Sequence, residues 1–514
     1  MVEGTNSQTA GKKEKIKTWF KNPYNLLILG VLILALIIRL YFFFLTQNQP
    51  LWWDEAEYML KGKSMFLGTP STGWAIQREI VIPIIWGFFS KIFNSEFLPR
   101  LLQIVVSLVT VFFTYLLGKE IYNKKIGIIA AVIMSVNAIH LFFTVRLLTY
   151  LLAPLFFVLT FYCFWKGYVK KESKLLLYLT PFIAALGASI YSSVAFTGIA
   201  VVLYLLITEH FKFLKKKEIW IMGGIALVSL LPYFIYSQIS YGSPVARWAS
   251  LNASEHGLNF LYIFGYLNLS PHLFGWVFAI AIAIGLLYSI GYIIFSYDLL
   301  HKEGDESLKS HLIIISWVII SLGFYTYIAM SQGVVYDAFV LCAFPALAIA
   351  GAKGFELLDK FPIDKKIITL ILVVILILGC YNQISYSNAL INGKIDSYSQ
   401  VKQAGLWIKD NSNITDTIFS TSIPQITYYS ERETYSPNSV NNTIPINSSD
   451  ELAAQFKEKS PKFFADSVFE TRGSFIQEFV DKNQGALTVV QAYFLDPQQK
   501  SPALVIYSIN SSKI

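Results

Sequence analysis

Charged residues are scarce in this sequence. Only 14% of its 514 residues are Asp, Glu, Lys or Arg, whereas 54% are hydrophobic. Soluble domains carry about 25% charged residues. A chain with so little charge could not cover its surface in water, which excludes a soluble enzyme, a disordered protein and a nucleic-acid binder. We therefore expect a polytopic α-helical membrane protein.

Cysteine is also rare. The chain has three cysteines, Cys163, Cys342 and Cys380, and each lies inside an apolar run. Their placement predicts neither a disulfide framework nor a zinc site, so we expect them to be buried packing residues. Internal repeats are absent, and so are P-loop, Rossmann and metalloprotease motifs.

Long apolar runs make up most of the chain. Residues 1–24 are lysine-rich and are predicted to be a cytoplasmic tail, and residues 25–45 form the first run. About 20 apolar residues cross ~30 Å of hydrocarbon. The eleven predicted spans are 25–45, 99–118, 126–145, 151–168, 175–190, 192–208, 219–239, 272–297, 312–331, 337–357 and 367–386. They place a transmembrane domain at 25–386.

The basic residues predict the orientation. With the N-terminus inside, and with the short apolar segment 80–93 lying at the outer surface, the N-terminal tail and the inner loops together hold 22 Lys and Arg, and the outer loops hold seven. This excess is typical of cytoplasmic loops. We expect a plasma-membrane protein with a cytoplasmic N-terminus and an extracytoplasmic C-terminus.

The composition changes after the last span. Residues 387–514 are polar and contain two amphipathic segments, 399–411 and 449–459, which predict helices. Strands are predicted at 416–422, 462–469, 486–494 and 503–509. The sequence therefore predicts a separate α/β domain of about 125 residues on the outer face.

The first outer loop, 46–98, contains the residues most suited to chemistry. It begins with two tryptophans followed by Asp54, Glu55 and Glu57. Tryptophans suit the membrane–water boundary. A carboxyl group in partly apolar surroundings has a raised pKa, which suits a general base. A solvated acidic cap on an interfacial helix is the alternative.

The chain resembles the GT-C glycosyltransferases, above all the protein O-mannosyltransferase family and the aminoarabinose transferases of lipid A. The resemblance comprises the Asp-Glu pair after the first span, the amphipathic return segment, and four short stretches. These stretches are 96–101 (EFLPRL), 118–122 (GKEIY), 126–131 (IGIIAA) and 344–348 (FPALA). The outer C-terminal domain also resembles those of many relatives.

This resemblance implies a fold and a reaction. Members of the family transfer one sugar from a polyprenyl-phosphate carrier on the outer face, with inversion at the anomeric carbon. It implies that Asp54 is the catalytic base for an acceptor hydroxyl and that Glu55 supports or orients it. The acceptor could be a protein, a lipid or a glycan, and the sugar a hexose or a pentose.

Arginines of the outer loops are candidates for binding the donor phosphate, because a guanidinium pairs two phosphate oxygens at once. The candidates are Arg146, Arg78 beside Glu79, Arg100 and Arg247. Arg146 has no acidic neighbour in sequence, which favours a phosphate partner. Each could instead be an interfacial anchor that extends to lipid headgroups.

Two departures from the family bear on cofactors and acceptor. Relatives often have an acid a few residues after the position of Arg146, and an Arg-Tyr pair where this chain has Val335 and Tyr336. One Asp-Glu pair makes a poor site for a hard divalent cation. We therefore expect a metal-independent enzyme without a cofactor.

Two other function classes remain open. A transporter or a flippase for lipid-linked sugars usually has ionisable groups at the midplane of the bilayer, whereas the predicted spans carry almost no charge apart from Arg39. An oligosaccharyltransferase or ligase would resemble the first outer loop. It would also have a Trp-Trp-Asp motif in the outer domain, and here that motif occurs only at 52–54.

Overall fold

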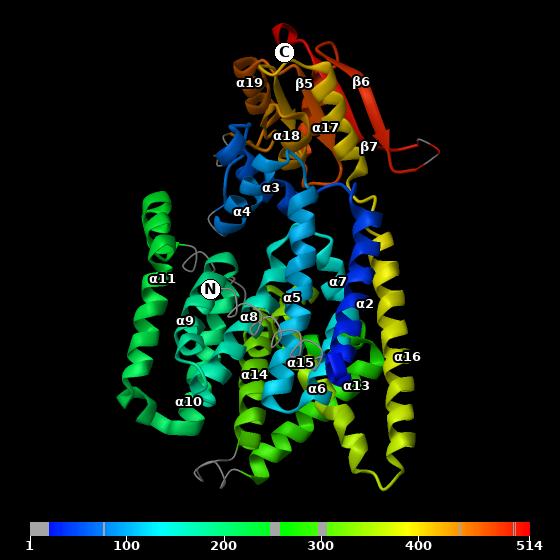
Figure 1. Ribbon diagram of the computed structural model, residues 1–514. Coiled ribbons are helices and arrows are strands. Elements are labelled where there is room, and N and C mark those ends of the chain that lie inside the picture. Colours follow the sequence, from blue (N-terminus) through cyan, green and yellow to red (C-terminus); the bar gives the residue numbers. More distant parts are fainter. Residues whose placement is uncertain are drawn as a thin grey trace, which may run out of the picture. The chain divides into compact units, whose positions relative to one another are not determined.

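The computed structural model describes residues 20–75, 78–246, 257–296, 306–440, 444–496, 498 and 500–514. The chain forms two compact units (Figure 1). The helical unit comprises residues 1–44, 102–145 and 149–391. The mixed unit comprises residues 45–101, 146–148 and 392–514.

Long apolar helices build the helical unit, as Figure 1 shows. They are α2 (Pro23–Thr46), α5 (Phe97–Ile121), α6 (Lys124–Val136), α7 (Ala138–Thr144), α8 (Leu152–Phe164), α9 (Lys174–Ile190), α10 (Phe196–Glu209), α11 (Lys217–Tyr241), α13 (Gly265–Phe295), α14 (Glu306–Gln332), α15 (Phe344–Glu356) and α16 (Lys365–Asn392). Short 3-10 or π turns extend several of them. The predicted fold class, a polytopic helical membrane protein, is confirmed.

Each of the eleven predicted spans corresponds to helix in the structure. Among the described residues, nine helical segments are long and apolar enough to cross a membrane, and the bent pair α6–α7 makes a tenth. The remaining predicted span is α9, which has 17 residues. At 1.5 Å per residue it is about 25 Å long, slightly less than the hydrocarbon core.

The break between α6 and α7 bends the chain by 57°. Backbone groups that lose their helical partners there are paired by side chains of the same unit. Arg39 donates to the Ser135 carbonyl over 3.0 Å, and Gln383 accepts from the Ala138 N–H over 2.9 Å. A buried arginine and glutamine thus stabilise an irregular backbone inside the helical unit, where unpaired groups would be expensive.

Small residues let the central helices approach closely. A β-carbon added at Gly285 of α13 would lie 1.8 Å from the carbonyl oxygen of Ala350, and one at Gly354 of α15 would lie 2.1 Å from that of Ala281. Close backbone approach at small residues is typical of membrane helices. It places α15 in the core, and 89% of the apolar window of its span is buried.

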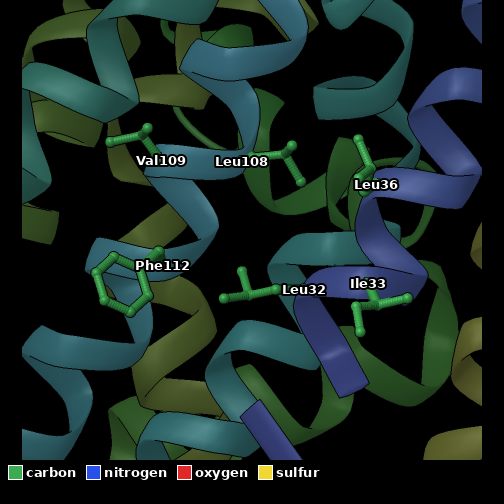
Figure 2. A pocket seen from close by; sticks show the side chains of 6 residues that line it. All are labelled: Leu32, Ile33, Leu36, Leu108, Val109 and Phe112. Atoms are coloured by element: carbon green, nitrogen blue, oxygen red, sulfur yellow. The ribbon is translucent and has the colours of Figure 1, made fainter. Parts of the chain in front are cut away.

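A groove of about 350 Å³ runs between α2 and α5. Figure 2 shows its six lining side chains, which are all apolar: Leu32, Ile33, Leu36, Leu108, Val109 and Phe112. Ile33, Leu36 and Phe112 are exposed. Exposed apolar side chains on a membrane-spanning helix suit contact with lipid chains.

The mixed unit contains the loop after α2, in which α3 (Trp53–Leu67) and α4 (Val81–Ile92) pack together. A β-carbon at Gly87 of α4 would lie 2.4 Å from the Gly62 carbonyl oxygen. The absence of a side chain at these two glycines therefore allows α3 and α4 to cross in close contact. The predicted interfacial segment 80–93 is therefore a short helix. The first outer loop belongs to the same compact unit as the C-terminal residues. The sequence assigned this loop to the transmembrane domain instead.

The C-terminal residues form the predicted α/β domain. Its helices are α17 (Ser399–Asn411), α18 (Ile423–Ser430), α19 (Ser449–Lys459) and α20 (Ser474–Lys482). Its strands are β1 (Thr417–Ser420), β2 (Glu433–Tyr435), β3 (Ser439–Val440), β4 (Ile444–Pro445), β5 (Phe463–Ser467), β6 (Leu487–Phe494) and β7 (Pro502–Ile509). The order of the main sheet is β2-β1-β5-β7-β6. Its β2-β1-β5 part is parallel, and its β5-β7-β6 part is antiparallel.

Three contacts within the mixed unit hold the first loop to the C-terminal residues. The Tyr429 hydroxyl accepts from the Leu51 N–H over 2.8 Å. Lys63 pairs with Glu431 over 3.3 Å, and the Lys402 ammonium donates to a backbone carbonyl of the loop over 2.8 Å. The first and third contacts lie just before the start of α3, where the candidate site is, and the Lys63 contact lies in the second half of the helix.

Candidate functional site

The candidate site is built on the first turn of α3, where Asp54 and Glu55 follow each other. Carboxylates are favourable there because the N-terminus of a helix carries partial positive charge. Successive residues of a helix point about 100° apart, so the two side chains have different surroundings. The Glu55 side chain is completely buried, whereas 42% of the Asp54 side chain is exposed.

Glu55 holds two segments of chain together. One carboxylate oxygen accepts from the Trp52 N–H over 2.8 Å and caps the helix. The other accepts from the Leu147 N–H over 2.6 Å. Glu55 also pairs with the Arg146 guanidinium at 3.5 Å. A fully buried carboxylate with these partners supports the backbone around Asp54.

Arg146 has an acidic partner, which the sequence did not indicate. Its side chain is 1% exposed, lies 3.9 Å from the centre of the Trp52 ring, and donates to the Lys394 carbonyl over 3.2 Å. Burial lowers the pKa of Arg146 to about 10, and the Glu55 charge opposes that shift. The guanidinium therefore stays charged at neutral pH. The sequence favours a phosphate partner for Arg146, and in the structure its guanidinium pairs with Glu55.

Arg78 is placed beside the exposed carboxylate. Its guanidinium donates to Asp54 over 2.7 Å and also pairs with Glu57. It lies 5.5 Å from the centre of the Tyr58 ring. Burial lowers the pKa of Arg78, but the hydrogen bond and charge of Asp54 outweigh it and the pKa is raised. The Arg78 side chain is 19% exposed.

Glu57 is a third carboxylate of the site. It accepts from the Trp53 indole N–H over 3.0 Å. Burial raises its pKa, although Arg78 opposes the shift. Asp54, Glu57 and Tyr58 lie three and four residues apart and so share one helix face. This spacing was visible in the sequence, and it identifies Glu57 as part of the cluster.

The other predicted residues lie in different surroundings. Glu79 is buried, and its charge adds to the effect of burial in raising the pKa of Tyr58. Arg100, in the first turn of α5, is 2% exposed and pairs with Glu96 over 2.6 Å. It also donates to the Gln49 carbonyl over 3.2 Å. Arg247 lies outside the described residues.

Two aromatic residues and one further acid, which the sequence analysis did not name, belong to the surroundings of Asp54. Trp74 packs edge-to-face on Tyr58, with 5.8 Å between the ring centres. Glu470 and Tyr398 of the C-terminal domain interact electrostatically with Asp54. The sequence reasoning missed these three residues, and no local pattern around them could have identified them.

Within the described residues, no group of three or more His, Cys, Asp or Glu side chains is placed to hold a metal ion. Asp54 and Glu57 are instead bridged by a guanidinium. Independence from metals remains a prediction.

Comparisons with known proteins address the fold. The family model of the dolichyl-phosphate-mannose-protein mannosyltransferases matches residues 78–236. The search of curated proteins found no match to this chain.

Solved structures match over most of the chain. ArnT from Cupriavidus metallidurans, in the apo state, has a TM-score of 0.70 at 11% identity, covering 95% of this chain and 99% of its own. The same protein bound to undecaprenyl phosphate has a TM-score of 0.65 at 12% identity, covering 95% and 98%. The oligosaccharyltransferase AglB from Archaeoglobus fulgidus, with an inhibitory peptide and a dolichol-phosphate, has a TM-score of 0.57 at 11% identity, covering 87% and 70%. The chain thus has the fold of the GT-C glycosyltransferases, and the predicted resemblance to that superfamily and its mannosyltransferase family is confirmed.

Proposed function

We propose that the protein is a membrane glycosyltransferase that moves one hexose or pentose from a polyprenyl phosphate to a hydroxyl group of a protein, lipid or glycan. The observation that carries this proposal is the pair formed by Asp54 and Arg78. The exposed carboxylate of Asp54 on α3 and the partly exposed Arg78, in the loop before α4, lie 2.7 Å apart. Together they provide a proton acceptor and a cation for a departing phosphate.

The reaction is a single inverting displacement. The acceptor hydroxyl oxygen bonds to the anomeric carbon while the bond from that carbon to the phosphate oxygen breaks. The phosphate leaves with the electron pair, and the hydroxyl proton passes to Asp54. Arg78 stabilises the charge that gathers on the phosphate, because a guanidinium binds two of its oxygens at once.

The other two candidate arginines that the structure describes suit a supporting role. Arg146 and Arg100 are at most 2% exposed, and each is paired with a carboxylate. A phosphate would have to displace these buried partners, which is unfavourable. We therefore assign the donor phosphate to Arg78, and we assign to Arg146 and Glu55 the positioning of the start of α3.

The matched structures support the class of donor. ArnT binds undecaprenyl phosphate and AglB binds a dolichol-phosphate, and the matched family model is named for dolichyl-phosphate-mannose. These are all polyprenyl phosphates. We further propose that transfer occurs on the extracytoplasmic face of the plasma membrane and needs no metal.

Replacement of Asp54 by Asn tests the proposal. The amide keeps the shape of the carboxylate but cannot take the proton, so turnover should fall by about 10²–10⁴-fold. The purified protein would be assayed with undecaprenyl phosphate carrying labelled mannose, glucose or aminoarabinose. A cell-envelope fraction from a strain lacking the protein would supply the acceptor.

A matched control is Asp450→Asn, whose side chain in the wild type is 95% exposed and lies in the first turn of α19. Its turnover should equal that of the wild type. Near-normal turnover by Asp54→Asn would reject Asp54 as the base. Failure of the wild type with all three donors would count against the donor class.

A further inference from the structure

The loop that follows α3 brings an indole ring to the proposed site. Gly68 ends α3 with a φ of 69°, a left-handed conformation that glycine adopts without strain, and its N–H donates to the Ser64 carbonyl over 3.2 Å. Further along the loop, the Arg78 N–H donates to the Ala75 carbonyl over 3.1 Å. Trp74 directly precedes Ala75, so this hydrogen bond keeps the backbone of Trp74 close to that of Arg78.

The Trp74 side chain is joined to the site through the ring of Tyr58. The two rings pack edge-to-face, with 5.8 Å between their centres and 65° between their planes. The Arg78 guanidinium lies 5.5 Å from the centre of the same Tyr58 ring and donates to Asp54 over 2.7 Å. Trp74, Tyr58, Arg78 and Asp54 therefore form one chain of direct contacts within the mixed unit.

Trp74 has an unused hydrogen-bond donor. Its Nε1 is buried and has no hydrogen-bond partner among the described residues. The Thr69 hydroxyl, on the same loop, is also buried and has no partner in the described part of the chain. Buried polar groups are nearly always hydrogen-bonded. Two unpaired groups on the loop that joins α3 to Arg78 point to a polar ligand there.

We propose that Trp74 takes part in selecting the sugar, by donating its indole N–H to a hydroxyl oxygen of the sugar that is transferred. This inference rests on the proposed function. With the donor phosphate on Arg78 and the acceptor hydroxyl at Asp54, the sugar lies beside this pair. Trp74 is separated from Arg78 by a single aromatic ring, and an indole N–H can only donate. A hydroxyl oxygen of the sugar is therefore a suitable partner for it.

Trp74→Phe tests the inference, because it keeps a ring that packs on Tyr58 but lacks the N–H. The assay uses the acceptor fraction described above and the donor that the wild type transfers fastest. The kcat/KM of the variant should be lower by about two- to tenfold, which is the contribution of one neutral hydrogen bond. A variant with the kcat/KM of the wild type overturns the inference.

Monodeoxy versions of the same donor identify the partner of the indole. One of them should slow the wild type by a similar factor and should slow Trp74→Phe no further, because the two changes remove the same hydrogen bond. If every deoxy donor slows both proteins equally, Trp74 has a packing role only. That result overturns the inference and leaves the proposed function standing.

Undecaprenyl phosphate without a sugar distinguishes the sugar from the phosphate as the partner. Its inhibition constant should be the same for the wild type and for Trp74→Phe. Weaker inhibition of the variant would assign the indole N–H to the phosphate and overturn the inference. The control is Trp220→Phe, since Trp220 is exposed on α11 and its indole donates to the Leu214 carbonyl over 2.9 Å. This variant should have the kinetics of the wild type.

Failure of the proposed function can be recognised separately. A wild type that transfers none of the sugars overturns the proposed function. Calorimetric binding of the three sugar-bearing donors then decides the inference without turnover. Weaker binding to Trp74→Phe than to the wild type supports the sugar contact, and equal binding overturns it.

Discussion

The two neighbouring carboxylates on α3, Asp54 and Glu55, differ in burial and in their partners. Glu55 is buried and binds two backbone N–H groups and a guanidinium, whereas Asp54 is exposed beside Arg78. The sequence predicted both residues and their division into base and support. It favoured Arg146 among the arginines for the donor phosphate, because the acid paired with Arg146 lies 91 positions away in the chain and leaves no local pattern.

Replacement of two arginines distinguishes positioning from phosphate binding. Arg146→Ala leaves Glu55 buried without its cation, and breaking such a pair costs about 3–5 kcal/mol. This variant should therefore unfold at a lower temperature. Arg78→Ala removes a partly exposed side chain, so it should stay folded, show a raised KM for the donor and turn over more slowly. Thermal unfolding in detergent and the transfer assay provide the two measurements.

Lys482→Ala serves as the reference for stability. The Lys482 side chain is 54% exposed and pairs with Glu478 on the surface, and such pairs contribute little to stability. Its unfolding temperature should match that of the wild type. If Arg146→Ala is as stable as the wild type but loses donor binding, the roles assigned to the two arginines are reversed.

At the scale of elements, helices and strands with a strong hydrophobic period could be predicted from the sequence, whereas short helices and breaks within helices could not. The predicted helices 399–411 and 449–459 agree with α17 and α19 residue for residue, and β1, β5, β6 and β7 lie at the predicted strands. Two helices of the domain, α18 and α20, were missed because they have eight and nine residues. The break at Asn137 was also missed, since the apolar run continues through it.

The crossing of α3 and α4 depends on glycine. Gly87→Ala would place a β-carbon 2.4 Å from the Gly62 carbonyl oxygen, and Gly62→Ala would place one 2.5 Å from the Pro83 carbonyl oxygen. Backbone atoms cannot move aside without displacing a whole helix, so each variant should be destabilised by about 1–3 kcal/mol or more. Because α3 carries Asp54, transfer activity should fall as well. Thermal unfolding and turnover would both be measured.

Gly223→Ala on α11 provides the comparison, because a β-carbon there would meet nothing within 4 Å. Alanine favours helix over glycine by up to about 1 kcal/mol, so this variant should be as stable as the wild type or slightly more stable. Equal stability of Gly87→Ala and Gly223→Ala would show that the helices can separate without penalty.

At the scale of the whole molecule, composition was enough to predict a multi-pass membrane protein, but it could not predict how the chain divides into compact units. The sequence placed a boundary near residue 387, whereas the mixed unit also contains residues 45–101 and 146–148. These segments join it through contacts such as Leu51 to Tyr429 and Glu55 to Leu147. Such long-range pairings leave no local pattern in the sequence.

The predicted orientation can be tested in intact cells. In a variant without the three native cysteines, a membrane-impermeant maleimide should label Asn413→Cys, which lies in the exposed turn before β1. It should label Phe211→Cys only after the membrane is made permeable. The reason is the excess of Lys and Arg in the loops predicted to be cytoplasmic. Labelling of Phe211→Cys in intact cells would show that the protein has the opposite orientation.

The discontinuity of the mixed unit has a consequence for biosynthesis. The ribosome completes α3 early, but Tyr429 and Glu431, which hold Leu51 and Lys63, emerge more than 360 residues later. Throughout that interval the nascent chain carries Asp54 on a helix that lacks these partners. Pairings so distant in sequence form late. We therefore expect the segment that carries Asp54 to reach its final packing only near the end of translation.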